Sequence, residues 1–287
     1  MTLPLTARCM RAILASRVRG ATRLTVAAAW LIPGLREVCI PVGSECDVYV
    51  DLRITASHHL LEGVLHEDHE RAFVSAIVQD GDVCWDIGAH FGLYTVLLSK
   101  RVGPQGKVFA FEPNSLLLPS LRRTVRDLPN VVLHPYALSN ASGPASFFVP
   151  PDFSAASLAN WTADKHDSTE ILVERRTADE LMREGRVERP SFIKCDVEGA
   201  ETLVFEGAKT MLNSETAPII LFEYNRGASE GFGLDGANAL SFLTQLTLPR
   251  YQLFEFEGAH GDIRNLVAVP FHRRRPLIGG LTGLRSL

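Results

Sequence analysis

Short, continuously apolar segments alternate with helical stretches from residue 83 onward, and this alternation constrains the fold more than any other feature of the sequence. The segments with strand character are 83–87, 107–112, 130–136, 191–196 and 218–224. Strands that are apolar on both faces are typical of a parallel sheet covered by helices on both sides. Two further apolar segments, 251–256 and 266–270, are separated by a Gly-rich turn instead of a helix. We therefore predict an α/β fold with a mostly parallel sheet and an antiparallel C-terminal hairpin.

An insertion interrupts this alternation between the third and fourth predicted strands. The segments 145–149 and 170–174 have strand character and are predicted to pair as a β-hairpin insertion. Thr177 and Glu180 form a capping box, so a helix should begin directly after the second of these segments.

The charge of the chain is unevenly distributed. The 287 residues have an ordinary globular composition, 46% hydrophobic and 22% charged, and a net charge of −4. Residues 1–36 hold six Arg and no acidic residue, residues 263–287 hold five Arg and no acidic residue, and the middle carries 18 basic and 33 acidic residues, a net charge of −15. An acidic body lacks the basic face that binds phosphates, so we expect no nucleic-acid partner. We expect a basic N-terminal extension over 1–36, a main domain over 37–270 and a basic flexible tail over 271–287.

The N-terminal extension leaves two interpretations open. Its longest uncharged stretch, 24–35, is 12 residues long, shorter than the roughly 20 residues that cross a bilayer. On a helical projection the apolar and basic side chains fall on two sides, which favours peripheral contact with a membrane surface. The apolar side holds Met10, Ile13, Leu14 and Leu24, and the basic side holds Arg8, Arg11, Arg19 and Arg23. Arg17 lies in the middle of the apolar side, which favours a surface helix or a loose arm instead.

The five cysteines are odd in number and show neither a CxxC motif nor zinc-ligand spacing. This pattern indicates free thiols in a reducing compartment, so we expect a cytoplasmic protein. Cys84 and Cys195 lie within apolar strands and should be buried.

The first candidate binding motif is Asp86-Ile-Gly88-Ala-His90-Phe-Gly92, between a predicted strand and a predicted helix. Gly88 and Gly92 permit a sharp turn and a close approach of a ligand to the backbone. The helix N-terminus beyond the turn presents unpaired N–H groups, and Asp86 adds a carboxylate. The spacing differs from GxGxxG, and the negative charge disfavours a pyrophosphate and favours an ammonium or sulfonium centre. The alternative is a plain tight turn.

The second candidate is Glu112, which ends the next predicted strand 20 residues after Gly92. A carboxylate at this position accepts hydrogen bonds from both ribose hydroxyls of a nucleoside. Dinucleotide enzymes share this feature, so Glu112 alone does not identify the nucleoside. An exposed carboxylate at a strand end is the alternative.

A third group of carboxylates follows the segment 191–196. Asp196 and Glu198 lie at the end of this predicted strand, and Glu223 ends the next one. Ligands of open α/β sheets bind outside the carboxyl ends of the strands. We therefore expect these side chains to share one crevice with the carboxylates of the first two motifs.

Together these segments resemble the FkbM family of S-adenosylmethionine-dependent methyltransferases. The resemblance is carried by Val83–Thr95, Val108-Phe-Ala-Phe-Glu-Pro-Asn114, Tyr136-Ala-Leu-Ser-Asn140, Phe192-Ile-Lys-Cys-Asp-Val-Glu-Gly-Ala-Glu201, Phe205-Glu-Gly-Ala208 and Leu221-Phe-Glu-Tyr-Asn225. It covers about residues 60–270. It implies a class I methyltransferase (Rossmann-like) sheet in a methyltransferase domain over 37–270. It also implies O-methylation of a hydroxyl on a sugar, a polyketide or another small-molecule or glycan acceptor.

The resemblance also implies roles for individual residues. It places Asp86, Gly88, His90 and Gly92 at the methionine end of S-adenosyl-L-methionine, Glu112 at the ribose, Asn114 near the adenosine and the backbone around Ala137 at the adenine. The family usually has Asn where His90 stands. A His side chain still donates a hydrogen bond, but its charge varies near neutral pH.

Asp196, Glu198 and Glu223 are the candidate catalytic residues. One of them can accept the proton of the acceptor hydroxyl as a general base. Alternatively, they hold a divalent cation, and an all-oxygen ligand set favours Mg²⁺ over Zn²⁺. Two other functions stay open: a nicotinamide-dependent oxidoreductase, which Asp86 disfavours, and a non-catalytic methyltransferase-like scaffold.

Overall fold

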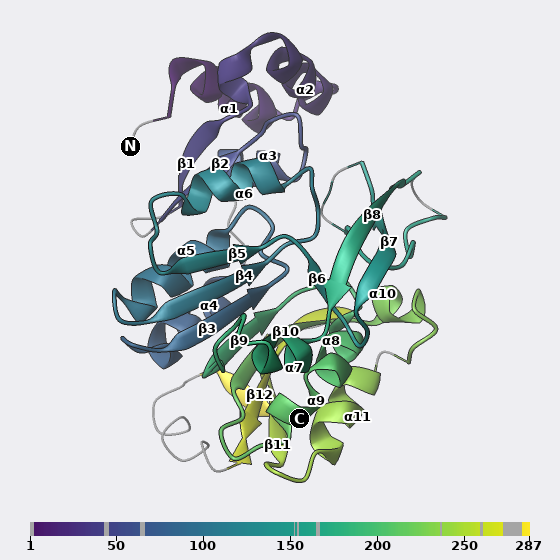
Figure 1. Cartoon of the computed structure of the whole chain (residues 1–287). Coiled ribbons are helices and arrows are strands. Elements are labelled where there is room, and N and C mark those ends of the chain that lie inside the picture. The colour runs from purple at the N-terminus through teal and green to yellow at the C-terminus, as the bar shows by residue number, and fades with distance from the viewer. Residues whose placement is uncertain are drawn as a thin grey trace.

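The computed structural model describes residues 3–42, 46–63, 67–151, 153, 155–164, 167–235, 237–258, 261–271 and 283–287. An eight-stranded sheet forms its centre, with helices on both faces (Figure 1). The order across the sheet is β13 (Leu284–Ser286), β11 (Tyr251–Phe256), β12 (Ile263–Pro270), β10 (Ile219–Asn225), β9 (Phe192–Cys195), β3 (Val83–Ile87), β4 (Lys107–Phe111) and β5 (Val131–His134).

The strand directions confirm the predicted class I methyltransferase sheet. The strands from β5 to β10 are parallel, and β12 runs antiparallel to both β10 and β11. The predicted C-terminal hairpin is therefore formed by β11 and β12. Within the sheet β12 lies between β11 and β10. Parallel pairing brings the carboxyl ends of β3, β4 and β9 to one edge of the sheet.

Two apolar cores lie on the two faces of this sheet. Trp85 and Ile87 of β3 belong to the core beneath α8 (Glu201–Gly207), α9 (Lys209–Leu212) and α11 (Asn238–Gln245). Cys84 belongs to the core beneath α4 (Asp68–Ile77) and α5 (Leu93–Val102). Successive side chains of a strand point to opposite faces, so a strand buried on both faces is apolar throughout. Cys84 and Cys195 are buried, as predicted.

The insertion forms the predicted hairpin. Strands β7 (Gly143–Val149) and β8 (Thr169–Arg176) pair antiparallel, and β6 (Ala137–Leu138) pairs with β8. The Thr177 hydroxyl accepts a hydrogen bond from the Glu180 N–H at 3.2 Å and begins α7 (Ala178–Arg183). Two further helices of the main domain are α6 (Leu118–Val125) and α10 (Arg226–Glu230).

The N-terminal region is folded, which excludes the loose arm for its helices. It comprises α1 (Leu5–Ala15), α2 (Ala21–Leu31), the short helix η1 (Pro33–Leu35), the hairpin of β1 (Val38–Val42) and β2 (Cys46–Val50), and α3 (Ser57–Glu62). Ala7 and Leu14 of α1 share a core with Phe91, Val96 and Leu117 of the main domain. These helices lie at one end of the molecule, and β11 lies toward the other (Figure 1).

The C-terminal segment differs from the expected flexible tail at its last residues. Leu284–Ser286 pair with β11 as an edge strand, while residues 272–282 lie outside the described residues. Among the described residues, no helix has the length and apolar character required to cross a membrane.

Candidate active site

A cavity of about 1100 Å³ opens at the carboxyl ends of β3, β4 and β9. Seven of the ten predicted site residues line this cavity: Asp86, Gly88, His90, Glu112, Ala137, Asp196 and Glu198. The structure therefore brings Asp86, Glu112 and Asp196 to one crevice, whereas Glu223, which we expected to share it, is not among the lining residues.

Gly88 lets the loops after β3 and β9 touch. Its φ of +85° lies in the left-handed region, and a Cβ at this position would lie 1.8 Å from the backbone oxygen of Asp196. A side chain would therefore push Asp196 away from the end of β3. Gly88 brings the first and third motifs together, which is a packing role in addition to the predicted approach to a ligand.

Asp86 lies at the floor of the cavity and is only 2% exposed. The Thr95 hydroxyl donates a hydrogen bond to Asp86 Oδ2 at 2.5 Å. Burial raises the pKa of Asp86 to about 6, although the Thr95 hydrogen bond and the charge of Lys194 oppose this shift. A cation next to a buried carboxylate stabilises its ionised form and so lowers its raised pKa again.

Glu112 organises the loop after β3. Its Oε2 accepts a hydrogen bond from the His90 N–H and its Oε1 accepts one from the Asn114 N–H, both at 2.8 Å. Burial raises the pKa of Glu112 to about 7, while these two hydrogen bonds lower it. Each carboxylate oxygen has about two acceptor sites, so Glu112 can still accept the two ribose hydroxyls of a nucleoside.

His90 is held in an unusual conformation beside Glu112. Its φ is +53°, and its Nε2 is buried without a hydrogen-bond partner among the described residues. Burial lowers the pKa of His90 to about 4. The imidazole is therefore neutral near pH 7, with one ring nitrogen as a hydrogen-bond donor and the other as an acceptor. The variable charge noted from the sequence does not apply to this buried side chain. An unpaired buried nitrogen that lines a cavity fits a site for a polar ligand.

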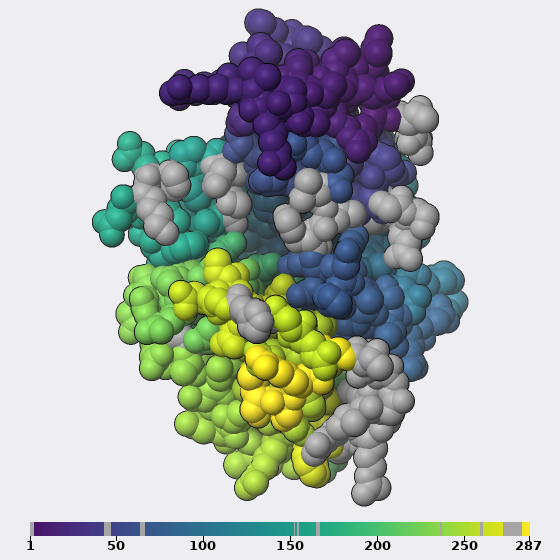
Figure 2. Space-filling model, turned by 180° about the vertical axis from the view of Figure 1, so that it is seen from behind, coloured from purple at the N-terminus to yellow at the C-terminus, as the bar shows by residue number. Residues whose placement is uncertain are grey.

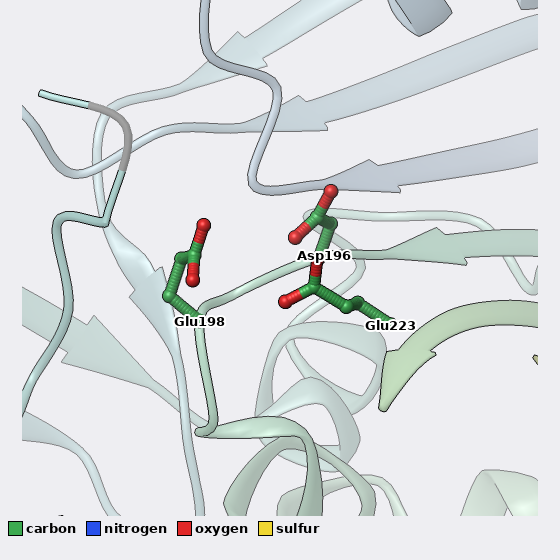
Figure 3. Close-up of side chains that lie close together, drawn as sticks. All are labelled: Asp196, Glu198 and Glu223. Atoms are coloured by element: carbon green, nitrogen blue, oxygen red, sulfur yellow. The ribbon is translucent and has the colours of Figure 1, made fainter. Parts of the chain in front are cut away.

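Asp196, Glu198 and Glu223 form a carboxylate cluster at the ends of β9 and β10 (Figure 3). One carboxylate oxygen from each residue lies within 4.8 Å of those of the other two. Burial raises the pKa of Glu223 to about 9, and the charges of Asp196 and Glu201 add to the shift. Burial also raises the pKa of Glu198 well above its ordinary value, and repulsion from Glu223 contributes next. The cluster therefore favours bound protons or a bound cation over three unpaired negative charges.

Lys194 supplies the positive charge next to this cluster. Its Nζ lies 2.6 Å from Asp196 Oδ2 and 5.0 Å from the centre of the Tyr94 ring. The Tyr94 hydroxyl donates to Glu67 Oε2 at 2.9 Å. Glu67, Tyr94 and Lys194 all line the cavity, so the residue before α4, together with α5 and β9, contributes polar groups to its wall.

Three predicted site residues do not line the cavity. Gly92 begins α5 with a φ of +91°, and a Cβ there would lie 2.8 Å from Leu121 Cδ1, so this glycine serves the packing of α5 on α6. Asn114 is fully buried, and its Oδ1 accepts from the Leu116 N–H at 3.1 Å. Glu223 is not among the lining residues, although one of its carboxylate oxygens lies within 4.8 Å of those of Asp196 and Glu198.

The N-terminal region contributes cavity residues that sequence reasoning missed. Arg17 and Val18 line the cavity from the connection between α1 and α2, Thr22 lines it from α2, and His58 and His59 line it from α3. One signal was present in the sequence, because Arg17 interrupts the apolar side of a predicted amphipathic helix. Nothing in the local pattern placed that arginine near residues 86–112, since the contact is made only by the folding of the chain.

Comparisons with known proteins identify the family of this chain. Residues 86–267 match the Methyltransferase FkbM domain family. The hexuronic acid methyltransferase AglP of Haloferax volcanii is 32% identical over 143 residues, which cover 50% of this chain and 56% of that protein. The chain thus matches little more than half the length of this relative.

Solved structures of methyltransferases are similar to this chain at lower identity. Precorrin-6y C5,15-methyltransferase from Geobacter metallireducens has a TM-score of 0.42 and 16% identity, over 71% of this chain and 90% of that chain. Aeropyrum pernix fibrillarin, in complex with S-adenosyl-L-methionine, has a TM-score of 0.43 and 12% identity, over 81% of this chain and 89% of that chain. The family match spans more than half of the chain, and the chain therefore belongs to the FkbM methyltransferase family.

Proposed function

We propose that this methyltransferase transfers the methyl group of S-adenosyl-L-methionine to a hydroxyl oxygen of a sugar, either free or within a glycan. The observation that carries the proposal is that Asp86, Glu112 and Asp196 line one cavity at the carboxyl ends of three neighbouring strands. The similarity to a hexuronic acid methyltransferase supports a sugar acceptor.

The cofactor site uses the residues around β3 and β4. Glu112 would accept the ribose hydroxyls, and Asp86, Gly88 and His90 would bind the methionine end. Ala137 would lie at the adenine, with the ring of Tyr136 beside it on the cavity wall. When bound, S-adenosyl-L-methionine supplies an electrophilic methyl group on a sulfonium cation. Acidic residues suit that charge better than they suit the pyrophosphate of a dinucleotide.

The acceptor proton would go to the carboxylate cluster. Glu198 lines the cavity, and its raised pKa makes its ionised form a stronger base than an ordinary glutamate. Lys194 fixes the neighbouring Asp196 by an ion pair, so Asp196 can accept a hydrogen bond from the acceptor hydroxyl. Methyl transfer depends mainly on holding that oxygen close to the methyl group and in line with it.

A divalent cation is a second candidate role for the same cluster. Three carboxylate oxygens within 4.8 Å of one another match the all-oxygen ligand set that Mg²⁺ prefers. Turnover that stops in chelator and returns with added Mg²⁺ would assign the cluster to a cation. Full turnover in chelator would assign it to proton transfer alone.

Calorimetric titration tests the cofactor, with S-adenosyl-L-methionine and NAD as parallel ligands. We expect heat of binding with the first and none with the second. Isotope-labelled S-adenosyl-L-methionine then tests the acceptor, in pools of uronic acids, neutral hexoses and glycans. Binding of NAD alone would contradict the proposal, and binding of neither ligand would favour a non-catalytic scaffold.

A further inference from the structure

We propose that the outer face of α2, together with the arginines around it, binds the surface of an anionic membrane. This surface, the α2 face, consists of Arg23, Leu24, Ala27, Trp30 and Leu31. The proposal stands apart from the methyl-transfer reaction, since it requires only the fold of the N-terminal helices.

The α2 face is apolar where a helix on the surface of a soluble protein is normally polar. On a helical projection Ala21, Thr25 and Ala29 form the buried side of α2, and the opposite arc is the α2 face. Leu24 is 55% exposed, Trp30 is 60% exposed and Leu31 is 82% exposed. An amphipathic helix normally presents charged and polar side chains on the side away from the core. Arg23 is the single charged residue of this helix.

Other exposed apolar side chains lie next to the α2 face. Ile32 directly follows it and is 38% exposed, and Val18, in the turn before α2, is 65% exposed. These side chains gather at one end of the molecule, where the space-filling view shows the N-terminal helices on the outside (Figure 2). A contiguous exposed apolar surface at one end marks an interaction site.

The charge around the α2 face identifies the partner as an anionic surface. Residues 1–36 contain six Arg and no acidic residue, while the chain as a whole carries −4. Within the described part of the chain, none of these six arginines forms a salt bridge. Arg8, Arg19 and Arg23 are exposed. Basic residues beside exposed Leu and Trp side chains are typical of helices that lie in a membrane interface.

Two arginine side chains lie beside the exposed ring of Trp30. The Arg53 guanidinium lies 4.7 Å from the ring centre, and the Arg36 guanidinium lies 5.9 Å from it. Tryptophan with adjacent arginines is enriched at the headgroup level of bilayers.

Vesicle co-sedimentation of the full chain tests this proposal. We expect the protein to pellet with vesicles of phosphatidylcholine and phosphatidylglycerol, and to stay in the supernatant with phosphatidylcholine alone. Leu24→Gln/Leu31→Gln should weaken binding by roughly tenfold or more, because the apolar contact is lost while helix propensity is kept. Arg19→Ser/Arg23→Ser should weaken binding about fivefold for each arginine removed, with the loss greatest at low salt.

Matched variants outside the α2 face control for folding and for total charge. Leu172 on β8 is 76% exposed, so Leu172→Gln removes a comparable leucine and should leave binding unchanged. Arg183→Ser/Arg250→Ser removes the same charge elsewhere and should also leave binding unchanged. A thermal midpoint equal to that of the parent protein shows that each variant is folded.

Two outcomes would overturn the proposal. Equal pelleting of the parent protein and Leu24→Gln/Leu31→Gln would show that the α2 face does not bind lipid. A dimer of the parent protein that becomes a monomer in this variant, without vesicle binding by either, would assign the α2 face to a second copy of the chain.

Discussion

The Nζ of Lys194 lies 2.6 Å from Oδ2 of Asp196, so a buried ammonium group lies among the carboxylates of the active site. Lys194 is only 3% exposed. Burial by itself would lower the pKa of Lys194, but attraction from Asp196, Glu67 and Asp86 is stronger and raises it. The ammonium group therefore stays charged and positions Asp196 at the cavity.

Removing the Lys194 ammonium should be more harmful than removing both charges of this ion pair. Lys194→Met leaves Asp196 without its partner and should lower the free energy of unfolding by about 3 kcal/mol. Lys194→Met/Asp196→Asn should recover part of this loss, because no unpaired charge is left. Urea unfolding of the parent protein and the variants, including Asp196→Asn alone, measures the coupling. Simple additivity of the two single changes would show that the ion pair does not stabilise the fold.

Replacing Glu112 should weaken cofactor binding and also loosen the loop after β3, because a Gln amide accepts from only one of the two backbone N–H groups. Glu112→Gln removes the negative charge that would accept the ribose hydroxyls, and we expect the Kd for S-adenosyl-L-methionine to rise by roughly tenfold to a hundredfold. Glu215→Gln makes the same chemical change at an exposed position and should leave Kd unchanged. Calorimetry measures both. An unchanged Kd for Glu112→Gln would remove this residue from the proposed site.

The stability of the protein should fall as the pH rises from about 4.5 to about 9, because of Glu223. In the folded protein the pKa of Glu223 is raised to about 9, from an ordinary value of 4.5. Its contribution is complete below the ordinary pKa and is lost as pH rises through the folded pKa, because the folded state holds the proton more tightly.

The variant Glu223→Gln stays neutral at every pH and isolates this effect. At pH 5 its free energy of unfolding should equal that of the parent protein. At pH 9 its free energy of unfolding should be higher than that of the parent by an amount on the order of 2 kcal/mol, or roughly 5 °C in the thermal midpoint. Glu215→Gln serves as the exposed control. A difference between variant and parent that does not change with pH would contradict a raised pKa at Glu223.

Two glycines with the same φ separate backbone strain from packing. Gly81 has a φ of +84° and nothing within 4 Å of a Cβ, whereas a Cβ at Gly88 would lie 1.8 Å from the Asp196 backbone oxygen. Gly81→Ala should cost about 1 kcal/mol for its conformation alone. Gly88→Ala should cost about 3 kcal/mol or more, since the loops after β3 and β9 must also separate. Equal effects in urea unfolding would contradict the close approach of these loops.

Arg17 should recognise an acidic acceptor, if the proposed reaction is correct. It lines the cavity and forms no salt bridge among the described residues. Arg17→Gln should raise the KM for a hexuronic acid acceptor about tenfold and leave the KM for a neutral hexose unchanged. Arg19→Gln is the control, because Arg19 is not among the cavity residues. An equal rise for both acceptors would assign Arg17 to the shape of the cavity instead.

The sequence by itself determined the central sheet and the position of three carboxylates at one of its edges. Continuous apolar segments separated by helices allow few arrangements other than a parallel sheet, and parallel strands bring Asp86, Glu112 and Asp196 to the same edge. The hairpin insertion was also predictable, because alternating strand character and the Thr177 cap are local signals.

Only the tertiary structure decided which neighbours those residues have. It placed Arg17 on the cavity wall and left Gly92, Asn114 and Glu223 out of the cavity lining. It also decided the protonation of Glu223 and His90, because burial sets a pKa and burial depends on the whole fold. Local patterns determine which side chains reach an edge of the sheet, whereas contacts between distant segments determine which of them meet a ligand.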